Sequence, residues 1–111
     1  MQIEEKILYD YMNGELIYKN KNVKFSYNEN EIMKILVENR DCFVDAKKIT
    51  EVVYGKDWML YCYSNIPTYI HRIRKKIKGI MQIDTRKGYG YKIRKITEEE
   101  HRRKGQMIYE I

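Results

Sequence analysis

The chain has 111 residues, which is enough for one domain with one hydrophobic core. Its net charge of +6 and its sequence pI of about 9.2 favour an anionic partner, without separating DNA from RNA or an anionic membrane. Two cysteines and two histidines without metal-ligand spacing predict neither a metal site nor a cofactor, and no apolar run is long enough for a membrane span. Because the N-terminus has no signal-peptide pattern, we expect a cytoplasmic protein.

Residues 3–25 are expected to form a small antiparallel sheet. Three strand-like runs, residues 3–12, 15–19 and 23–25, are separated by two turn signals. The first signal is Asn13-Gly14, because both residues tolerate the positive φ of a tight type I′ turn. The second is the Asn-Lys-Asn sequence of residues 20–22. The pattern therefore predicts strands joined by short turns.

Two helices are predicted after this sheet. Asn28 is the expected N-cap of the first, with Glu31 as its capping-box partner, and this helix should end near Asn39. Asp45 is expected to cap a second helix over residues 46–54, and Gly55 is its stop signal. The side chains expected to face inward are Ile32, Met33, Ile35, Leu36, Ile49, Val52 and Val53.

The next segment, residues 56–63 with the sequence KDWMLYCY, is too long for the tight turn of a simple helix-turn-helix. It is also rich in large apolar side chains. Two interpretations stay open, packing into the core or a protein-contact surface. The side chains concerned are Trp58, Met59, Leu60 and Tyr61.

Residues 64–78, SNIPTYIHRIRKKIK, predict an amphipathic helix. Ser64 or Asn65 can cap it, and Pro67 is tolerated in the first turn because the earliest amides of a helix have no internal acceptor. The stripe expected to be buried consists of Ile66, Ile70, Ile73 and Ile77. The opposite face, with its two flanks, contains no acid and carries Thr68, His71, Arg72, Lys75, Arg74 and Lys76.

This basic face is typical of a helix that enters the major groove, where flanking cations hold phosphates and central side chains meet base edges. Residues 67–95 contain ten Lys or Arg and the single acid Asp84, a local charge of +9. By itself the face fits a solvated helix equally well. His71 has no nucleophile or carboxylate partner nearby in the sequence, so we predict that the protein is not an enzyme.

A β-hairpin is predicted after Gly79, with strands over residues 80–85 and 91–96. The turn between them carries Arg86 and Lys87, and its two glycines are expected to supply positive φ. Thr97 and Glu100 form the capping box of a further short helix, and a last strand with the sequence MIYEI is expected to follow. That strand can add to a sheet edge of its own chain or of a neighbour.

The order of these elements resembles the winged-helix DNA-binding domain of OmpR/PhoB-type response regulators. Four stretches carry the resemblance: NENEIMKIL at 28–36, ITEVVYG at 49–55, IPTYIHRIRKKI at 66–77 and TRKGYGY at 85–91. They are similar to the family patterns T-x-x-E-x-x-L-L, L-x-x-x-V-W-G, V-x-x-H-I-x-x-L-R-x-K-L and T-V-R-G-x-G-Y. The chain departs from these patterns at Tyr54, Tyr69 and Pro67, which puts the base preference in doubt rather than the fold.

The resemblance implies an α+β winged helix-turn-helix, with an N-terminal antiparallel sheet, three helices and a C-terminal hairpin wing. We expect this domain over residues 1–96 and a C-terminal extension over residues 97–111. The implied function is a sequence-specific, double-stranded DNA-binding transcriptional regulator, with the helix of residues 65–78 in the major groove and the wing in the minor groove. The DNA-binding residues expected from pattern and resemblance together are Ser64, Asn65, Thr68, His71, Arg72, Arg74, Lys75, Lys76, Arg86 and Lys87.

The resemblance also implies partners other than DNA. In this family the loop before the recognition helix can meet RNA polymerase, here residues 56–63, and two copies commonly bind side by side on DNA. No receiver domain precedes the matched stretch and Met1 suggests that the chain begins here, so control by phosphorylation is not inferred. A second interpretation stays open, a winged-helix protein-interaction module whose basic face is incidental.

Overall fold

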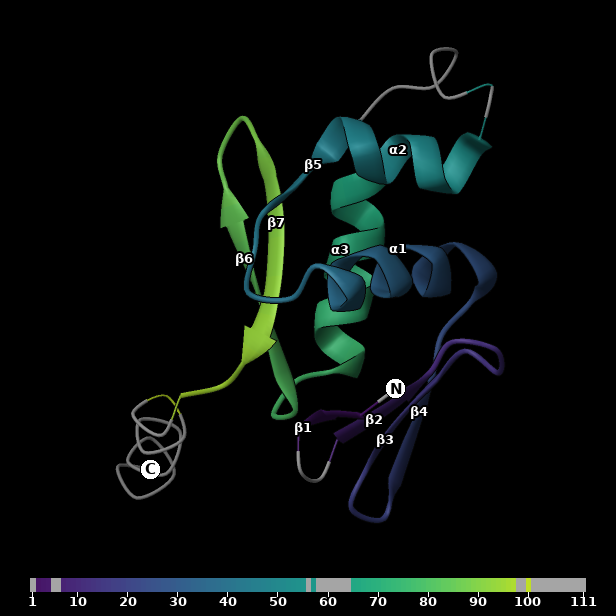
Figure 1. Ribbon diagram of the computed structural model, residues 1–111, viewed down its shortest axis with the longest axis vertical. Helices are drawn as coiled ribbons and strands as arrows, with labels where there is room; N and C mark the ends of the chain where they lie inside the picture. The colour runs from purple at the N-terminus through teal and green to yellow at the C-terminus, as the bar shows by residue number, and fades with distance from the viewer. Residues whose placement is uncertain (1, 5–6, 56, 58–64, 98–99, 101–111) are drawn as a thin grey trace.

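The computed structural model describes residues 2–4, 7–55, 57, 65–97 and 100, and in it three helices lie between two antiparallel sheets (Figure 1). The first sheet, in the order β1-β2-β3-β4, contains β1 (Gln2–Glu4), β2 (Ile7–Asp10), β3 (Glu15–Tyr18) and β4 (Lys21–Lys24). The helices are α1 (Tyr27–Glu38), α2 (Ala46–Tyr54) and α3 (Asn65–Lys76). The second sheet, in the order β5-β7-β6, contains β5 (Val44–Asp45), β6 (Met81–Arg86) and β7 (Gly90–Lys95). The predicted α+β winged-helix fold is confirmed.

The N-terminal sheet differs from its prediction in two details. The first predicted strand is divided into β1 and β2, and β4 starts at Lys21, inside the predicted second turn. The predicted type I′ turn at Asn13-Gly14 is wrong, because Asp10 pairs with Glu15 across a four-residue loop. In that loop only Gly14 has positive φ, at 66°, and the Asp10 carboxylate accepts hydrogen bonds from the backbone and side chain of Asn13. The aspartate thus stabilises a longer turn than the Asn-Gly pair predicts.

The helix α1 begins earlier than predicted, because the N-cap is Ser26 rather than Asn28. Ser26 Oγ accepts from the backbone N–H of Glu29 at 3.4 Å, and Glu29 Oε1 accepts from the backbone N–H of Ser26 at 2.8 Å. Both Ser26-x-x-Glu29 and Asn28-x-x-Glu31 fit the capping-box pattern. The structure has the box that begins at Ser26. In this fold Glu29 also pairs with Lys76, and Asn28 Nδ2 donates to the Tyr69 hydroxyl at 2.9 Å.

Other helix limits agree with the sequence. Asn39 is the C-cap of α1, Asp45 caps α2 by accepting from the backbone N–H of Lys47, and Gly55 ends α2 with a φ of 64°. The helix α3 ends at Lys76, two residues before the predicted limit. Its isoleucine stripe is buried as predicted, and each member is 0% exposed: Ile66, Ile70, Ile73 and Ile77.

One hydrophobic core joins the helices to both sheets. Its largest fully buried side chains come from β2, β3, all three helices and the hairpin, and they are Tyr9, Leu16, Ile32, Met33, Leu36, Ile49, Ile66, Ile70, Ile73, Ile77, Ile83 and Ile93. Val52 and Val53 of α2 pack at its margin and are only partly buried. Because the stripe of α3 faces this core, its polar face is turned outward.

The hairpin β6–β7 is confirmed, and the structure adds β5, which was not predicted. Val44 pairs with Tyr91 and Asp45 with Gly90, so β7 is the central strand. Gly88 has the positive φ expected of the turn, at 78°, whereas Gly90 does not. A Cβ on Gly90 would lie 1.8 Å from the carbonyl oxygen of Val44, so this glycine is needed for the close approach of β5.

The capping box of the C-terminal extension is present. Thr97 Oγ1 accepts from the backbone N–H of Glu100 at 3.2 Å, and Glu100 Oε1 accepts from the backbone N–H of Thr97 at 3.1 Å. The remaining predictions for the extension, with its MIYEI strand, lie outside the described residues, as do those for Trp58, Met59, Leu60, Tyr61 and Ser64.

Candidate nucleic-acid interface

The outward face of α3 presents polar and cationic side chains to solvent. Five of the predicted contact residues are exposed on it, and they are Asn65, Thr68, His71, Arg72 and Lys75. The buried isoleucines on the opposite side fix which face is outward. One side of the helix therefore offers hydrogen-bond donors and positive charge together.

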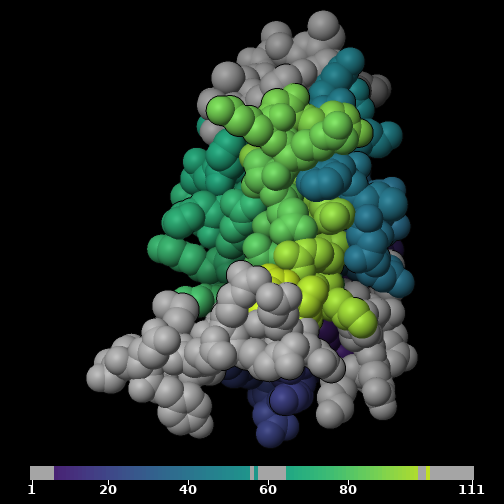
Figure 2. Space-filling view, turned by 90° about the vertical axis from the view of Figure 1, so that its left-hand side faces the viewer, coloured from purple at the N-terminus to yellow at the C-terminus, as the bar shows by residue number. Residues whose placement is uncertain are grey.

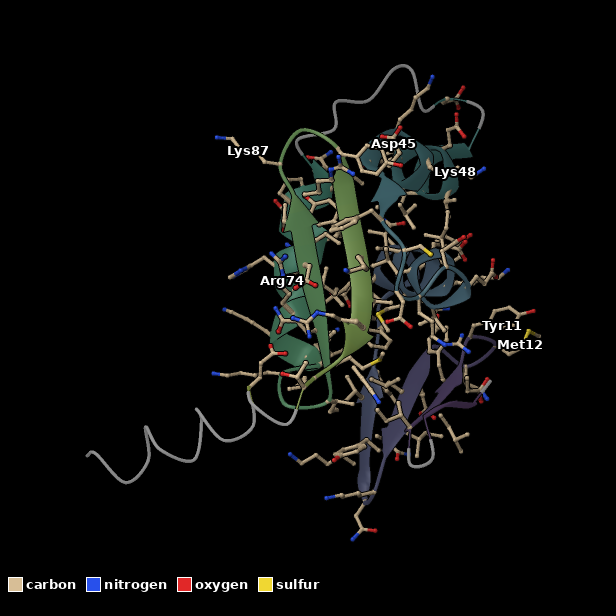
Figure 3. The ribbon with its side chains drawn as sticks, turned by 60° about the vertical axis from the view of Figure 1, so that its left-hand side comes forward. Tyr11, Met12, Asp45, Lys48, Arg74 and Lys87 are labelled. Carbon is tan, nitrogen blue, oxygen red and sulfur yellow. The ribbon has the colours of Figure 1, made fainter. Side chains whose placement is uncertain are left out.

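Arg74 and Lys76, the predicted flanking cations, are bonded within the protein. Arg74 Nε and Nη2 donate to the carbonyl oxygen of Ile83 at 3.2 and 2.8 Å, and Nη2 also donates to Thr85 Oγ1 at 2.6 Å. Because β6 is an edge strand, Arg74 supplies donors to it from outside the sheet, and Figure 3 shows Arg74 beside the hairpin. Lys76 Nζ lies 2.6 Å from Glu29 Oε1 and donates to the carbonyl oxygen of Lys24 at 3.0 Å. Because these donors are used within the protein, both cations help to hold the fold together.

A groove of about 330 Å³ runs between α3 and β6. Three of its basic side chains, His71, Lys75 and Lys78, are exposed. Lys78 was not among the predicted contacts, although its place three residues after Lys75 was a signal for it. Gln82 of β6 also lines the groove, and no local pattern singles it out. The groove brings the C-terminal part of α3 and the first strand of the wing into one basic surface.

The wing carries exposed Arg86 and Lys87, as predicted. The backbone N–H of Tyr89 donates to the carbonyl oxygen of Arg86 at 3.0 Å, which closes the turn, and the Arg86 guanidinium lies 5.4 Å from the Tyr89 ring centroid. Lys87 projects away from the body of the protein (Figure 3). In the space-filling view the hairpin lies between α3 and the segment that runs from α1 to α2 (Figure 2). The wing tip is thus a defined cationic projection beside the outward face of α3.

The single acid in the basic third of the chain is paired. Asp84 Oδ2 lies 2.6 Å from Arg94 Nε and 3.9 Å from Lys92 Nζ. Arg94 also bonds Glu100, with 2.8 Å between Nη1 and Oε1. The hydrogen bonds to Glu100 and Asp84 raise the pKa of Arg94. Hydrogen bonds from Arg94, and then from Thr97, lower the pKa of Glu100 to about 2. Neither carboxylate is left unpaired to oppose an anion at the surface.

No group of three or more His, Cys, Asp or Glu side chains within residues 2–4, 7–55, 57, 65–97 and 100 is arranged to hold a metal ion. Within the same ranges, no helix has both the length and the apolar character needed to span a membrane.

A recognition-type helix beside a hairpin with a cationic tip defines a winged-helix DNA-binding domain. The sequence matches the family described as "Transcriptional regulatory protein, C terminal" over residues 20–93, more than half of the chain. The protein therefore belongs to this family, the OmpR/PhoB-type effector domains, and is a DNA-binding domain of a transcriptional regulator.

Solved structures show the same fold. The C-terminal domain of the nisin resistance regulator NsrR, described as a lantibiotic response regulator, is 24% identical with a TM-score of 0.70, over 86% of this chain and 100% of that one. DrrB of Thermotoga maritima is 26% identical with a TM-score of 0.66, over 78% of this chain and 41% of that one. The RstA DNA-binding domain of Klebsiella pneumoniae, solved in complex with the RstA box, is 19% identical with a TM-score of 0.68, over 83% and 93%. A comparison with curated proteins gives no significant match.

Proposed function

We propose that this domain binds double-stranded DNA in a sequence-specific manner, with α3 in the major groove and the wing in the minor groove. The supporting observation is the outward face of α3, where Thr68, His71, Arg72 and Lys75 are exposed while the apolar stripe is buried. The RstA domain, which has the same fold, is described as being in complex with its DNA box. We extend to this chain only the kind of ligand, duplex DNA.

Base reading is assigned in this proposal chiefly to Arg72. Its guanidinium lies 5.9 Å from the ring centroid of Tyr69, and the Tyr69 hydroxyl accepts from Asn28 Nδ2 at 2.9 Å. A ring anchored to α1 in this way provides a fixed platform for the guanidinium. Arginine can fork onto O6 and N7 of guanine in the major groove, so a platform that limits its rotamers favours one register.

Backbone contacts are assigned to the cations around Arg72. Lys75 and Lys78 border the groove between α3 and β6, and we assign to them a phosphate of the strand that passes the helix. At the wing tip, Lys87 would place a point charge in the minor groove, where narrow segments concentrate negative potential. Lysines of this kind orient the domain and strengthen binding without choosing a sequence.

The decisive experiment is selection of bound sites from random duplex DNA, followed by titration of the selected and scrambled duplexes at several salt concentrations. We expect a defined sequence and a preference of at least about 1,000-fold, the lower end for specific binding. The alternative, a protein-interaction module with an incidental basic face, predicts weak binding without preference. That result would refute the proposal.

We also propose that two copies occupy adjacent half-sites about one helical turn apart. The support is the C-terminal extension, whose start is fixed to the hairpin by Arg94 between Asp84 and Glu100. Deleting residues 105–111 should leave binding to one half-site nearly intact and abolish cooperative filling of the pair. Footprints that cover one half-site at saturation would contradict this arrangement. We treat residues 1–96 as the DNA-binding domain and residues 97–111 as the extension.

A contact with RNA polymerase through residues 56–63 is the remaining proposal. Its basis is the apolar sequence of that segment, with Trp58 at its centre. The described helices on either side, α2 and α3, already place their own apolar residues in the core. We propose that the apolar side chains of this segment bind a protein partner instead of packing in the core.

A further inference from the structure

An ion pair between the buried carboxylate of Glu29 and Lys76, whose side chain is 37% exposed, connects the first turn of α1 to the last residue of α3. Glu29 is only 3% exposed, and its Oε1 lies 2.6 Å from Lys76 Nζ. The two residues are 47 positions apart in the sequence. The same carboxylate also accepts from the backbone N–H of Ser26 at 2.8 Å. One side chain therefore serves both the cap of α1 and the end of the recognition helix.

Glu29 is held in its ionised form. Burial by itself would raise its pKa, but the hydrogen bonds from Lys76 and from the backbone of Ser26 outweigh burial and lower the pKa. Separation of the pair is unfavourable because it would leave the buried Glu29 carboxylate without the partner that Lys76 provides. The pair is intermediate between a buried ion pair and a surface salt bridge, because the carboxylate is buried and the ammonium is partly exposed.

Lys76 meets three parts of the N-terminal region at once. Besides Glu29, its ammonium donates to the carbonyl oxygen of Lys24 at 3.0 Å, and it lies 5.8 Å from the ring centroid of Phe25. Lys24 is the last residue of β4, so the end of α3 is attached to the sheet as well as to α1. These partners already use the charge of Lys76, which leaves the pair with Glu29 electrically neutral toward a distant phosphate.

Arg74 provides a second attachment on the other flank of α3. Successive helical residues are rotated by about 100°, so Arg74 and Lys76 point in roughly opposite directions around the axis. Arg74 bonds the hairpin through Ile83 and Thr85, and Lys76 bonds the N-terminal region. Attachments on both flanks set the rotation of α3 about its own axis. That rotation decides which side chains face a bound duplex.

We propose that Glu29 is a positioning residue for DNA binding. Through Lys76 it fixes the rotation of α3 about its axis, so that the outward face of α3 points toward the base edges of a bound duplex. The inference rests on the proposed function, and it assigns a role in recognition to a residue that a bound duplex does not touch. It also assigns Lys76 to orientation of the helix rather than to a phosphate contact.

The test compares three glutamine variants on the selected duplex and on a scrambled duplex: Glu29→Gln, Lys76→Gln and, as matched control, the adjacent exposed Lys75→Gln. Glu29→Gln and Lys76→Gln should each weaken specific binding about tenfold, in the range of coupled residues, and the double variant should be no worse than either single variant. Neither should change the slope of log affinity against log salt. Lys75→Gln should reduce that slope by about one unit, as expected for a lost phosphate contact.

A second measurement tests, in the absence of DNA, how firmly Lys76 attaches the end of α3 to the N-terminal region. Amide exchange in the last turn of α3 should become faster in Glu29→Gln and Lys76→Gln relative to α2, and should stay unchanged in Lys75→Gln. Lys76→Arg should restore both exchange protection and specific binding. If Glu29→Gln fails to fold, the outcome is decided by Lys76→Gln, because this variant leaves the capping box between Ser26 and Glu29 intact.

Three outcomes would overturn the inference. One is a salt slope reduced by about one unit in Lys76→Gln, which would make this lysine a phosphate contact. The second is unchanged or tighter specific binding by Glu29→Gln, which would mean that the carboxylate does not help to position α3 for DNA binding. The third is unchanged exchange protection of α3 in both variants. A wild-type chain without sequence preference would instead refute the proposed function, and the exchange comparison would still decide whether the pair orients α3.

Discussion

Replacing Gly90 by alanine tests how the wing is attached to the helical body. A Cβ at this position would lie 1.8 Å from the carbonyl oxygen of Val44, 2.7 Å from its carbon and 3.0 Å from the Cα of Asp45. All three atoms belong to the backbone of β5, so no side-chain rotation can relieve the overlap. The strand must move away from β7, and its pairs Val44↔Tyr91 and Asp45↔Gly90 must weaken.

The expected magnitude follows from these contacts. Overpacking in a well-packed region costs about 1–3 kcal/mol, and each hydrogen bond lost from the β5 attachment adds about 1 kcal/mol. One bond at risk joins the backbone N–H of Ala46 to the carbonyl oxygen of Tyr89 at 2.9 Å. We therefore expect Gly90→Ala to lower the free energy of unfolding by about 2–4 kcal/mol, a large part of the 5–15 kcal/mol typical of a domain.

Urea unfolding followed by circular dichroism measures this loss, with Gly88→Ala as the matched control. Gly88 has a φ of 78°, and no atom lies within 4 Å of the position that a Cβ would take there, so alanine introduces backbone strain without a clash. Strain of that kind costs about 1–2 kcal/mol. A loss below about 1 kcal/mol in Gly90→Ala, or equal losses in the two variants, would show that β5 can move freely and would refute the reasoning.

Four further outcomes are expected. Arg72→Ala should cost about 1–3 kcal/mol on the selected site and relax its base preference, and equal losses on selected and random DNA would reassign Arg72 to phosphate. Lys87→Ala should weaken binding to all duplexes and reduce the salt slope by about one unit, whereas an unchanged slope would remove the wing from the interface. Trp58→Ala should keep fold and DNA affinity but lose regulation of a reporter promoter, and unfolding would instead place Trp58 in the core. Glu100, whose pKa is lowered from 4.5 to about 2 by Arg94 first, should add stability above pH 4.5 that disappears as the pH falls toward 2, so the difference from Glu100→Gln in acid unfolding curves should vanish there.

Short-range patterns in the sequence were sufficient for the main elements of the fold. The isoleucine stripe of α3, the Asp45 cap of α2 and the hairpin with its turn at Gly88 are all present as predicted. Each depends on residues a few positions apart, because side-chain period, capping and turn conformation are local properties of the chain. The exposed face of α3 follows from the same period, and the contact of its side chains with DNA remains a prediction.

Choices between equivalent local patterns were made by the tertiary structure. Two capping boxes compete at the start of α1, and Ser26 prevails in the fold that gives Glu29 its partner Lys76. The two-residue strand β5 is too short to show a period, and only its pairing with β7 defines it. Gly90 likewise resembles a turn glycine in sequence, whereas its function is to let β5 approach.

The cations of α3 show most clearly the difference between what the sequence determines and what the tertiary structure decides. In the sequence, Arg72, Arg74, Lys75 and Lys76 form one basic cluster, and nothing local separates a cation that can meet DNA from one that holds the helix. The structure separates them by their partners: Arg74 bonds β6 and Lys76 bonds Glu29, whereas Arg72 lies over the Tyr69 ring and Lys75 lines the groove beside β6. Ion pairs between distant segments depend on how helices and strands pack together, so helical period alone identifies the basic face but not the role of each charge on it.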